Sequence, residues 1–496
     1  MVLRSFFRKH WYEISLFAIL LLSVALRFYD FSNRFGLAYD QARDVIVARE
    51  ALRAFTIPMI GPFASAGPFV YGPQWYWLLM LFVAVSPGAL ITPWIVQDLL
   101  YVLSVFVMVL IGKEISGKTF GLLLGLLFSV SVGQVAQSVN LSSPSMVGIV
   151  AVYCVYVAVL FLKKENPIFA GLLGFLIGNA INIHFQAIGL IFLGISSLLI
   201  IRKNRFRSVG YFLIGFLIPF IPLFLFDINN NFFESKNILE YYLHGQYVTA
   251  LPKRWLTYAF VFWPDAWARI VGGYLYFSYP LIVFLGIITI YHLWKRSISR
   301  VIVSLLLFFA VEIVLLRYYT GPLYHSYLST LHPVIVLFSG WALYQLIKMR
   351  KRIGMLVTLI LICGSLLLNI NEIRNSSNNT ARQAEAKRKL LLAVYPERKF
   401  AVYDYGYNST ANSLPLVLYL QVNGEISDDG YKIGFGSTTG VKKQIHNEIS
   451  GNLSGFRLRD LNSSSSAELS KEGWAFVNPS IVYHSTVRWY EDKNSE

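Results

Sequence analysis

The sequence predicts a polytopic α-helical membrane protein that carries a small hydrophilic α/β domain at its C-terminal end. Of the 496 residues, 55% are hydrophobic and only 14% are charged, whereas about a quarter of a soluble protein's residues are charged. The mean hydropathy is +0.54. Apolar runs of about twenty residues, enough to cross a bilayer, recur between Ile14 and Ile370. An ordinary soluble fold is therefore excluded.

Short basic clusters separate the apolar runs, and such clusters mark the cytoplasmic side of a membrane protein. Between two consecutive clusters the chain must cross to the outer side and return, so the segment between them contains an even number of membrane crossings. About eleven spanning helices (range 10–13) follow, with a cytoplasmic N-terminus and an external C-terminus. The clusters are Arg4/Arg8/Lys9, Lys113/Lys118, Lys163/Lys164, Arg202/Lys203/Arg205/Arg207, Lys295/Arg296/Arg300 and Lys348/Arg350/Lys351/Arg352. The expected helices are 14–30, 92–111, 119–136, 143–162, 167–183, 185–201, 208–226, 274–294, 301–317, 327–347 and 353–370.

One apolar stretch, 74–86, does not fit this count as a spanning helix. It is bounded by Pro73 and Pro87, and its Trp and Tyr residues suit a membrane interface. A span needs about twenty residues, so this stretch is too short to cross comfortably. We interpret it as a juxtamembrane or re-entrant helix on the outer side. If this stretch does span the membrane, the predicted side of every later loop is reversed until another correction is found.

Charge, cysteines and the N-terminus exclude other classes. The net charge of +16 invites a nucleic-acid partner, but its basic residues lie in the short clusters that membrane topology requires. Cys154 and Cys363 both fall in apolar runs and form neither a disulfide framework nor a metal motif. The first apolar run lacks a small-residue cleavage site, so we expect a retained helix.

The chain divides into a membrane domain, 1–370, and a soluble extracytoplasmic domain, 371–496, where hydropathy falls. The first external loop, 31–91, is long enough for an amphipathic helix at 41–55 and the aromatic helix at 74–86. A second long external segment, 227–273, is rich in aromatic residues. In the C-terminal domain we expect a linker and helix at 371–388, a strand at 400–403, a buried element at 417–420, and turns and loops from Gly424 to Ser466.

With this topology, nearly all the unusual polar residues fall on the outer face. Any one of them alone is best explained as a solvated loop residue, or for His184 as an interhelical hydrogen bond. Their joint placement predicts one outward-facing polar site. They are Asp40 with Arg43, Tyr71-Gly72-Pro73, Asn140 to Pro144, His184-Phe185-Gln186, Asp227-Ile228-Asn229, and Arg317-Tyr318-Tyr319 with His325.

Asp40 and Arg43 are the most informative of these residues. A carboxylate and a guanidinium three residues apart share one face of a helix. Charged groups near hydrocarbon are costly, so such a pair is a functional candidate. In the alternative interpretation, Asp40 is the N-cap of the following helix and Arg43 lies in its first turn. A residue can serve as a cap and in catalysis together.

Several motifs occur in a characteristic order within about 10–350. They are Asp40-Gln41-Ala42-Arg43 with Ala48-Arg49-Glu50, Tyr71-Gly72-Pro73-Gln74-Trp75-Tyr76-Trp77, Asn140 to Ser145, Gly178 to Gln186, Phe226-Asp227 and, more weakly, Tyr324-His325-Ser326-Tyr327 before Pro333. In these motifs the chain resembles a C-type (GT-C) membrane glycosyltransferase of the family-39 group, related to the protein O-mannosyltransferases and the lipid A aminoarabinose transferase.

The resemblance implies transfer of a sugar from a polyprenyl phosphate to a lipid, glycan or protein acceptor on the outer face of a bacterial inner membrane, usually with inversion. An acceptor hydroxyl needs a base, and Asp40 is our candidate. Fixed cations stabilise the departing phosphate, and Arg43 and Arg317 are the candidates; Arg317 could equally be a snorkelling interfacial residue. The expected substrate-binding residues are Tyr71, Asn140, His184, Gln186, Asp227, Tyr318 and His325. Tyr71, Trp75 and Trp77 could stack on sugar or line the lipid groove, although a generic aromatic belt is the better explanation of the two tryptophans.

The sequence departs from the family pattern at two places. Gln41 replaces the acidic residue that usually follows the Asp. Val70-Tyr71 stands at the position where the aminoarabinose transferase has a Glu-Lys pair. An acid that could bind metal and a lysine that could bind phosphate are thus missing there. No cofactor is certain, a divalent metal ion stays possible, and the aminoarabinose substrate is in doubt.

Two other classes of protein remain open. In a polytopic transporter or lipid-linked-sugar flippase, the same polar residues would line a translocation path. The absence of a tandem period and of paired broken segments counts modestly against an inverted-repeat transporter. In a catalytically inactive scaffold, the membrane domain would only display the C-terminal domain.

Overall fold

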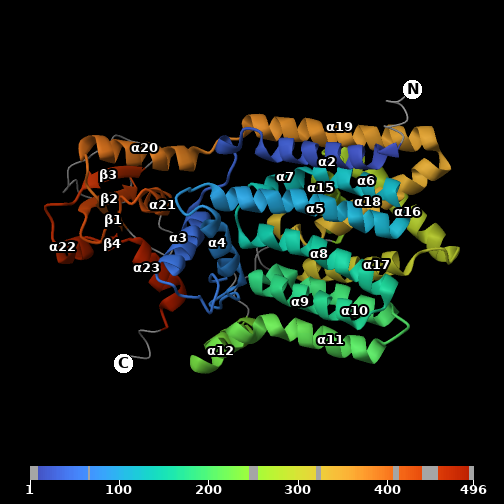
Figure 1. Ribbon diagram of the computed structural model, residues 1–496, viewed down its shortest axis with the longest axis horizontal. Helices are drawn as coiled ribbons and strands as arrows, with labels where there is room; N and C mark the ends of the chain where they lie inside the picture. Colours follow the sequence, from blue (N-terminus) through green and yellow to red (C-terminus); the bar gives the residue numbers. More distant parts are fainter. Residues whose placement is uncertain are drawn as a thin grey trace. The chain divides into compact units, whose positions relative to one another are not determined.

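The computed structural model describes residues 9–64, 67–244, 255–319, 325–405, 413–437 and 456–490. It groups the chain into two compact units, each formed from separate segments (Figure 1). The first unit comprises 1–31, 64–72 and 97–376, and the second comprises 32–63, 73–96 and 377–496. The expected domain boundary after residue 370 lies close to the last of these junctions and stays a prediction.

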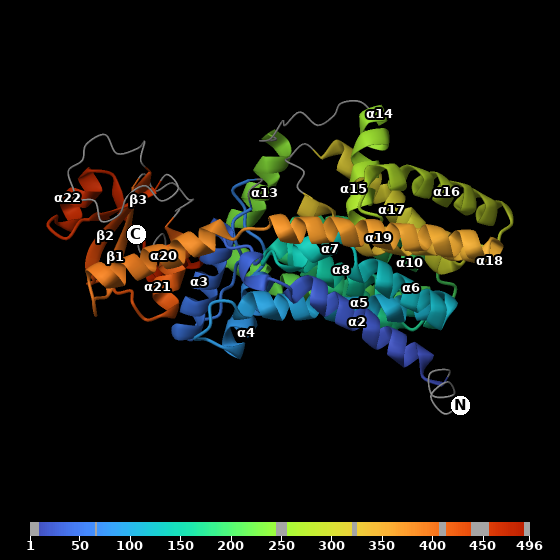
Figure 2. The same cartoon turned by 90° about the horizontal axis from the view of Figure 1, so that it is seen from above.

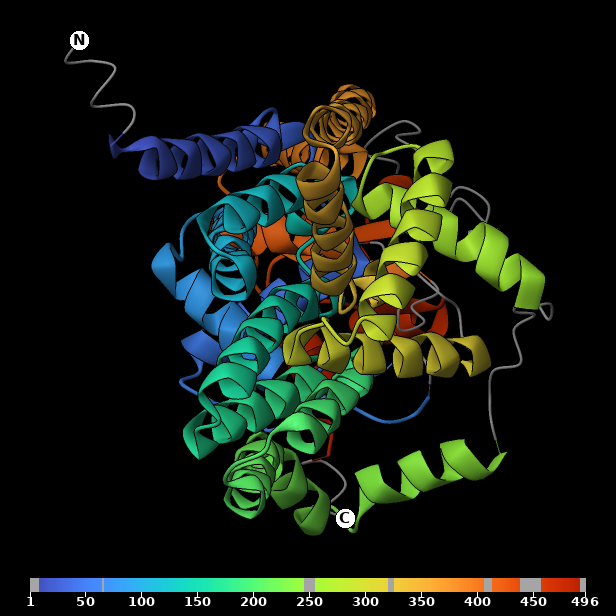
Figure 3. The same ribbon diagram turned by 90° about the vertical axis from the view of Figure 1, so that its right-hand side faces the viewer.

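The first unit is a bundle of apolar helices, which Figure 3 views along their length. Each of the eleven segments expected to span is helical. The helices are α2 (Trp11–Phe28), α5 (Thr92–Ser116), α6 (Lys118–Ser129) with α7 (Val132–Ser138), α8 (Ser143–Lys164), α9 (Pro167–Ile183), α10 (Leu190–Ile200), α11 (Arg205–Leu217) continued by η3 (Ile218–Phe220) and α12 (Ile221–Asn229), α16 (Leu275–Trp294), α17 (Arg300–Tyr318), α18 (His332–Met349) and α19 (Lys351–Asn375).

The described helices do not all reach the length of a bilayer span. Seven are long and apolar enough to cross, and an eighth results if α6 and α7, which meet at a 60° bend, form one broken span. The helices α4 (Gln74–Val85), α9 and η2–α10 (Phe185–Ile200) are apolar but shorter. A multi-pass membrane protein follows, while the count of eleven and the orientation of the termini stay predictions.

Glycines allow α9 and α11 to pack with their backbones in close contact. A Cβ atom on Gly174 would lie 2.2 Å from the carbonyl oxygen of Phe212, and one on Gly215 would lie 2.0 Å from that of Gly171. Membrane helices gain association energy from such close packing, since lipid gives them no hydrophobic drive to associate. Larger residues at these two positions would separate the helices.

Shorter elements connect the helices of this first unit. They are η2 (Phe185–Gly189), α13 (Phe233–His244), α14 (Trp255–Thr257), the π-helical turn η4 (Tyr258–Phe262), α15 (Trp263–Ile270) and η5 (His325–Leu328). The segment expected to lie along the outer interface, 227–273, is therefore largely helical where the structure describes it. Its placement at the interface stays a prediction.

The second unit contains a four-stranded sheet in the order β3-β2-β1-β4, whose strands are all labelled in Figure 1 and which Figure 2 shows from above. Strands β1 (Phe400–Tyr405) and β2 (Tyr431–Ser437) pair in parallel, and α21 (Leu414–Val422) lies between them in the sequence. The pairs of β2 with β3 (Phe456–Asp460) and of β1 with β4 (Trp474–Phe476) are antiparallel. The remaining elements are α20 (Asn379–Val394), α22 (Ser466–Lys471), α23 (Pro479–Tyr483) and η6 (His484–Arg488). The expected strand and buried element are β1 and α21.

Two helices of the 31–91 segment belong to this second unit. Helix α3 (Tyr39–Arg53) packs against α4, α21 and α23. Gln421 of α21 donates a 2.7 Å hydrogen bond to Glu50 of α3, which connects these two helices. Helix α4 has 12 residues, about 18 Å of helix, which is shorter than a bilayer core. Its position on the outer side stays a prediction, and its packing in this unit supports it.

Candidate functional site

The start of α3 decides how Asp40 can be used. The N-cap residue is Ala38, and its N–H donates a 3.1 Å hydrogen bond to the side-chain oxygen of Gln41. Asp40 therefore lies within the first turn, and its interpretation as the N-cap is wrong. The residue that departs from the family pattern, Gln41, satisfies the helix start instead. The carboxylate of Asp40 remains near the positive end of the helix dipole.

Arg43 lies between two carboxylates. Its Nη1 is 3.0 Å from Oδ1 of Asp40, and its Nη2 is 2.7 Å from Oδ1 of Asp44. Its Nε also donates to Oδ1 of Asp44, at 2.9 Å. The side chains of Arg43 and Asp44 are 17% and 7% exposed, whereas that of Asp40 is 69% exposed. The buried end of the cluster is thus fixed, and the Asp40 end is open.

Asp44 is held by two aromatic residues of α4. Trp75 Nε1 donates a 2.7 Å hydrogen bond to Oδ2, and the Tyr76 hydroxyl donates a 3.3 Å bond to Oδ1. Burial raises the pKa of Asp44, although the Arg43 guanidinium opposes this shift. Burial alone would lower the pKa of Arg43, but its negative neighbours, Asp44 foremost, raise it well above its ordinary value. The pair is therefore a buried ion pair with its remaining hydrogen bonds satisfied.

The tryptophans of α4 have structural partners. Trp75 is fully buried, so its assignment to an aromatic belt at the lipid surface is wrong. Trp77 donates its Nε1–H to the carbonyl oxygen of Pro58, at 2.9 Å. The motif that carries these residues therefore builds the support for Asp44.

Tyr71 and His184 meet in the first unit. The Tyr71 hydroxyl is 3.0 Å from His184 Nε2, and the two rings lie 4.6 Å apart between centroids. The Nδ1 atom of His184 accepts the backbone N–H of Gln186, at 3.2 Å. A neutral imidazole with Nδ1 as acceptor carries its proton on Nε2, so His184 donates to the Tyr71 oxygen. The ring of Tyr327 packs on His184 from 5.2 Å.

Gln186 and Asn140 join neighbouring loops in the same unit. The Gln186 amide donates to the carbonyl oxygen of Pro144, at 2.9 Å, and to Ser329 Oγ, at 3.2 Å. The backbone oxygen of Asn140 accepts a 2.9 Å hydrogen bond from Gln97. Both residues therefore have a structural role, and their role in substrate binding stays a prediction.

Asp227 organises the beginning of α13. Its Oδ1 accepts the backbone N–H of Glu234, at 2.7 Å, and that of Ser235, at 3.2 Å. Glu234 in turn accepts the N–H of Val70, at 2.9 Å, next to Tyr71. Burial raises the pKa of Glu234 to about 8. Asp227 and the Tyr71 segment are thus connected through a buried carboxyl.

Arg317, Tyr318 and His325 lie at the ends of other elements in the first unit. The Arg317 guanidinium packs over the rings of Trp255 and Tyr258, 5.2 Å and 5.9 Å from their centroids. Tyr318, 68% exposed, also packs edge-on against Trp255. His325 is exposed at the start of η5, and Tyr324 of the same motif lies outside the described residues.

The structure thus brings the predicted residues together in separate groups. Asp40 and Arg43 form one group in the second unit, and Tyr71 with His184 forms another in the first. Gln186 adjoins His184, Asp227 is linked to Tyr71 through Glu234 and Val70, and Arg317 shares Trp255 with Tyr318. Over the described parts of the chain, no group of three or more His, Cys, Asp or Glu side chains could hold a metal ion.

Two buried carboxyls were missed by the sequence interpretation. Asp44 follows Asp40 by four residues and so lies on the same helix face, which was an available signal. Glu234 carried no such signal, because its partner Val70 is far away in the sequence. Only the fold brings these two together.

Comparison with solved structures identifies the architecture. ArnT from Cupriavidus metallidurans, in the apo state, matches 92% of this chain and 99% of its own, with a TM-score of 0.64 and 11% identity. The same protein bound to undecaprenyl phosphate gives a TM-score of 0.63 at 10% identity, covering 89% and 97% of the two chains. The oligosaccharyltransferase AglB from Archaeoglobus fulgidus, with an inhibitory peptide and a dolichol-phosphate, covers 87% of this chain and 70% of its own, with a TM-score of 0.52 and 12% identity.

Comparison of the whole sequence with known families and proteins gives no match. No protein-family model matches it, and no curated protein is recognisably similar. At identities this low, the likeness concerns the fold. The chain has the GT-C fold of the membrane glycosyltransferases ArnT and AglB, as its motifs indicated.

Proposed function

We propose that the chain is a membrane glycosyltransferase that moves a sugar from a polyprenyl-phosphate donor to a lipid, glycan or protein acceptor on the outer face of the inner membrane, with inversion. One observation carries the proposal: an exposed Asp40 carboxylate is held by an Arg43 whose other side is fixed on buried Asp44. The fold supports it. Two similar structures hold a polyprenyl phosphate, undecaprenyl phosphate in ArnT and a dolichol-phosphate in AglB.

Asp40 is the proposed base. The acceptor hydroxyl loses its proton to the carboxylate while its oxygen forms a bond to the anomeric carbon. The bond between that carbon and the phosphate oxygen breaks, and the lipid phosphate leaves with the electron pair. Attack from the side opposite the phosphate inverts the anomeric centre. The exposure of Asp40 suits this role, because an acceptor must reach it.

Arg43 is the proposed contact of the donor phosphate. Asp44 occupies its Nε and Nη2, so a phosphate would meet the guanidinium at Nη1, which now contacts Asp40. Donor binding would then exchange the Asp40 carboxylate for a phosphate oxygen and free Asp40 for the acceptor. Guanidinium is suited to such an exchange, since it binds carboxylate and phosphate alike. Arg317 is the second proposed phosphate contact.

The substrate-binding roles of Tyr71, His184 and their neighbours belong to the same proposal. The ordered Tyr71–His184 pair presents a hydroxyl and a ring of fixed tautomer, which suit the hydroxyl groups of a sugar. A divalent metal stays an expectation, and no step above depends on one. The AglB protein has also been crystallised with Zn and sulfate.

The test is sugar transfer by the purified full-length protein. It is incubated with a panel of polyprenyl-phosphate sugars, and release of the lipid phosphate is followed by mass spectrometry. We expect release with at least one donor, and a loss of about a thousandfold in Asp40→Asn, the scale of a missing general base. Asp30→Asn, which removes an exposed carboxylate before α3, is the matched control and should retain activity.

Two results would contradict the proposal. Normal transfer by a folded Asp40→Asn variant would remove Asp40 as the base. Movement of a lipid-linked sugar across reconstituted vesicles, with no new glycosidic bond, would instead favour the transporter or flippase.

A further inference from the structure

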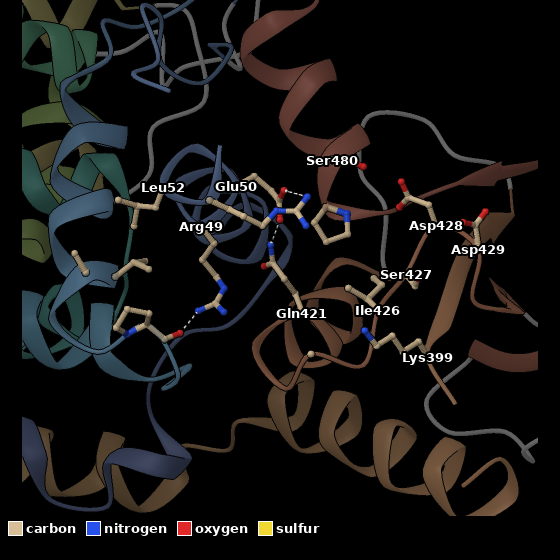
Figure 4. Close-up of a pocket in the computed structure, with 16 residues that line it drawn as sticks. Arg49, Glu50, Leu52, Lys399, Gln421, Ile426, Ser427, Asp428, Asp429 and Ser480 are labelled. Atoms are coloured by element: carbon tan, nitrogen blue, oxygen red, sulfur yellow. Dashed lines mark hydrogen bonds and ion pairs between the residues drawn. The ribbon is translucent and has the colours of Figure 1, made fainter. Parts of the chain in front are cut away.

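A cleft of about 870 Å³, lined by both charged and aliphatic side chains, lies within the second unit, away from the Asp40 end of α3 (Figure 4). Its walls come from the last turns of α3, from the end of α4 and from the C-terminal domain. At 100° per residue, Arg49 is turned about 180° from Asp40 around the axis of α3. The cleft is therefore separate from the proposed catalytic carboxylate.

Two cations of the cleft form no ion pair among the described residues. Arg49 donates only to the carbonyl oxygen of Pro87, at 2.5 Å, and its buried Nε has no hydrogen-bond partner there. Burial lowers the pKa of Arg49, and the neighbouring Glu50 carboxylate opposes this shift. Lys399, the residue before β1, lines the cleft and is exposed. The buried Nε–H of Arg49, which has no partner there, and the exposed ammonium of Lys399 therefore suit an anionic ligand.

The carboxylates of the cleft differ in their partners and in their exposure to solvent. Glu50 is already paired with Arg53, at 2.8 Å, and accepts from Gln421, at 2.7 Å. Asp428 accepts a 2.6 Å hydrogen bond from Asn478 and, like Asp429, is exposed at the rim. Exposed carboxylates accept hydrogen bonds from hydroxyl groups. The rim is thus suited to a ligand with several hydroxyls.

The rest of the lining narrows the ligand class. Among the described residues that line the cleft, none carries an aromatic ring. A nucleotide base would normally be held by stacking on such a ring, so a nucleotide is not favoured. Ser427, Ser480 and the amide of Gln421 add further hydrogen-bonding groups, and aliphatic side chains form the rest of the wall. Its size lies within the range of ordinary ligand sites.

We propose that this cleft binds an anionic saccharide, with its phosphate or carboxylate between Arg49 and Lys399 and its hydroxyls at Asp428 and Asp429. The proposal goes beyond sugar transfer, because it assigns a second site that does not include the groups placed at the reacting atoms. It gives the contact of α3 with the C-terminal domain a function in ligand binding.

Calorimetric titration of the full-length protein tests the proposal with defined probes. Trigalacturonic acid and mannose 6-phosphate carry the two possible anions, while maltotriose and inorganic phosphate are the controls for sugar and anion alone. We expect one charged saccharide to bind, and Lys399→Gln to weaken it about tenfold, as loss of one charge-assisted hydrogen bond would. The matched control is Arg398→Gln. It removes a neighbouring positive charge that packs over Tyr431, 5.3 Å from the ring centroid, and does not line the cleft.

Each other outcome overturns a defined part of the proposal. If maltotriose bound as tightly as the charged saccharides, the ligand would not need an anion. If inorganic phosphate bound as tightly as they do, the ligand would not need a sugar. Equal weakening by Arg398→Gln and Lys399→Gln would show a general charge effect. If no probe binds, the cleft is not a saccharide site, whether or not the protein transfers sugar. Asp429→Asn supplies a second variant at an exposed position, and it should weaken the charged saccharide but not inorganic phosphate.

Discussion

The indole Nε1 of Trp75 donates a 2.7 Å hydrogen bond to the Oδ2 atom of Asp44, the buried carboxylate that holds Arg43. Through this bond, the aromatic motif of α4 supports the charged motif of α3. The two motifs are separated in the sequence by the Gly/Pro-rich part of the first loop.

Replacing Asp44 by Asn should destabilise the protein. The change leaves the Arg43 guanidinium, 17% exposed, without its main counter-charge, and breaking a buried ion pair costs about 3 kcal/mol. Thermal unfolding of the purified protein measures this loss. The control is Glu385→Gln, which breaks an exposed pair with Lys389 and should cost less than about 0.5 kcal/mol. Equal stability of the two variants would argue against the buried pair.

Replacing Trp75 by Phe should reduce sugar transfer while Trp77→Phe leaves it nearly unchanged. Both variants lose one indole hydrogen bond, but only Trp75 donates to a carboxylate of the charged cluster. Loss of a hydrogen bond to a charged group costs about 1.5–3 kcal/mol. Comparison of kcat/KM, with unfolding temperatures as a check, separates the two effects. A similar drop in activity in both variants would point to general damage of α4.

The stability of the protein should fall as the pH rises from about 5 to 8, in part because of Glu234. Its folded pKa, about 8, exceeds its ordinary value of 4.5, so in this window the folded state retains a proton that the unfolded state has lost. The stabilisation is complete below the unfolded pKa and is lost as the pH rises through the folded one. Its full size is on the order of 5 kcal/mol.

Glu234→Gln tests this contribution. The amide oxygen can still accept the Val70 N–H, and the side chain no longer ionises, so the slope of unfolding temperature against pH should flatten. The control Glu240→Gln, on the same helix but 59% exposed, should retain the wild-type slope. A wild-type slope in Glu234→Gln would assign the pH dependence to other groups.

Replacing Tyr71 by Phe should lower kcat/KM for transfer about tenfold, the effect of losing one neutral hydrogen bond at a substrate-positioning residue. The variant retains the ring that packs on His184 but removes the oxygen that Nε2 faces. Tyr211→Phe, at an exposed position of α11, is the control. Unchanged kinetics in Tyr71→Phe would remove this pair from the proposed substrate site.

The sequence by itself determined the class of protein and the position of the helices in the segments expected to cross the membrane. Hydropathy and basic clusters are local properties, and they located each of the eleven expected segments, all of which are helical. The motifs also led to the GT-C fold that the comparison with ArnT supports. The number of membrane spans was harder to predict from the sequence, because a bent pair such as α6–α7 or a short helix such as α9 need not form one complete span.

Only the tertiary structure decided which residues act on one another. Asp44 became part of the charged cluster because α4 brings Trp75 and Tyr76 to it, and Gln41 replaced Asp40 in capping because the helix begins earlier. Glu234 reached Val70 across a long stretch of chain. Such partners depend on long-range packing, which no local pattern of residues encodes, whereas hydropathy and helix periodicity are determined within a few turns of chain.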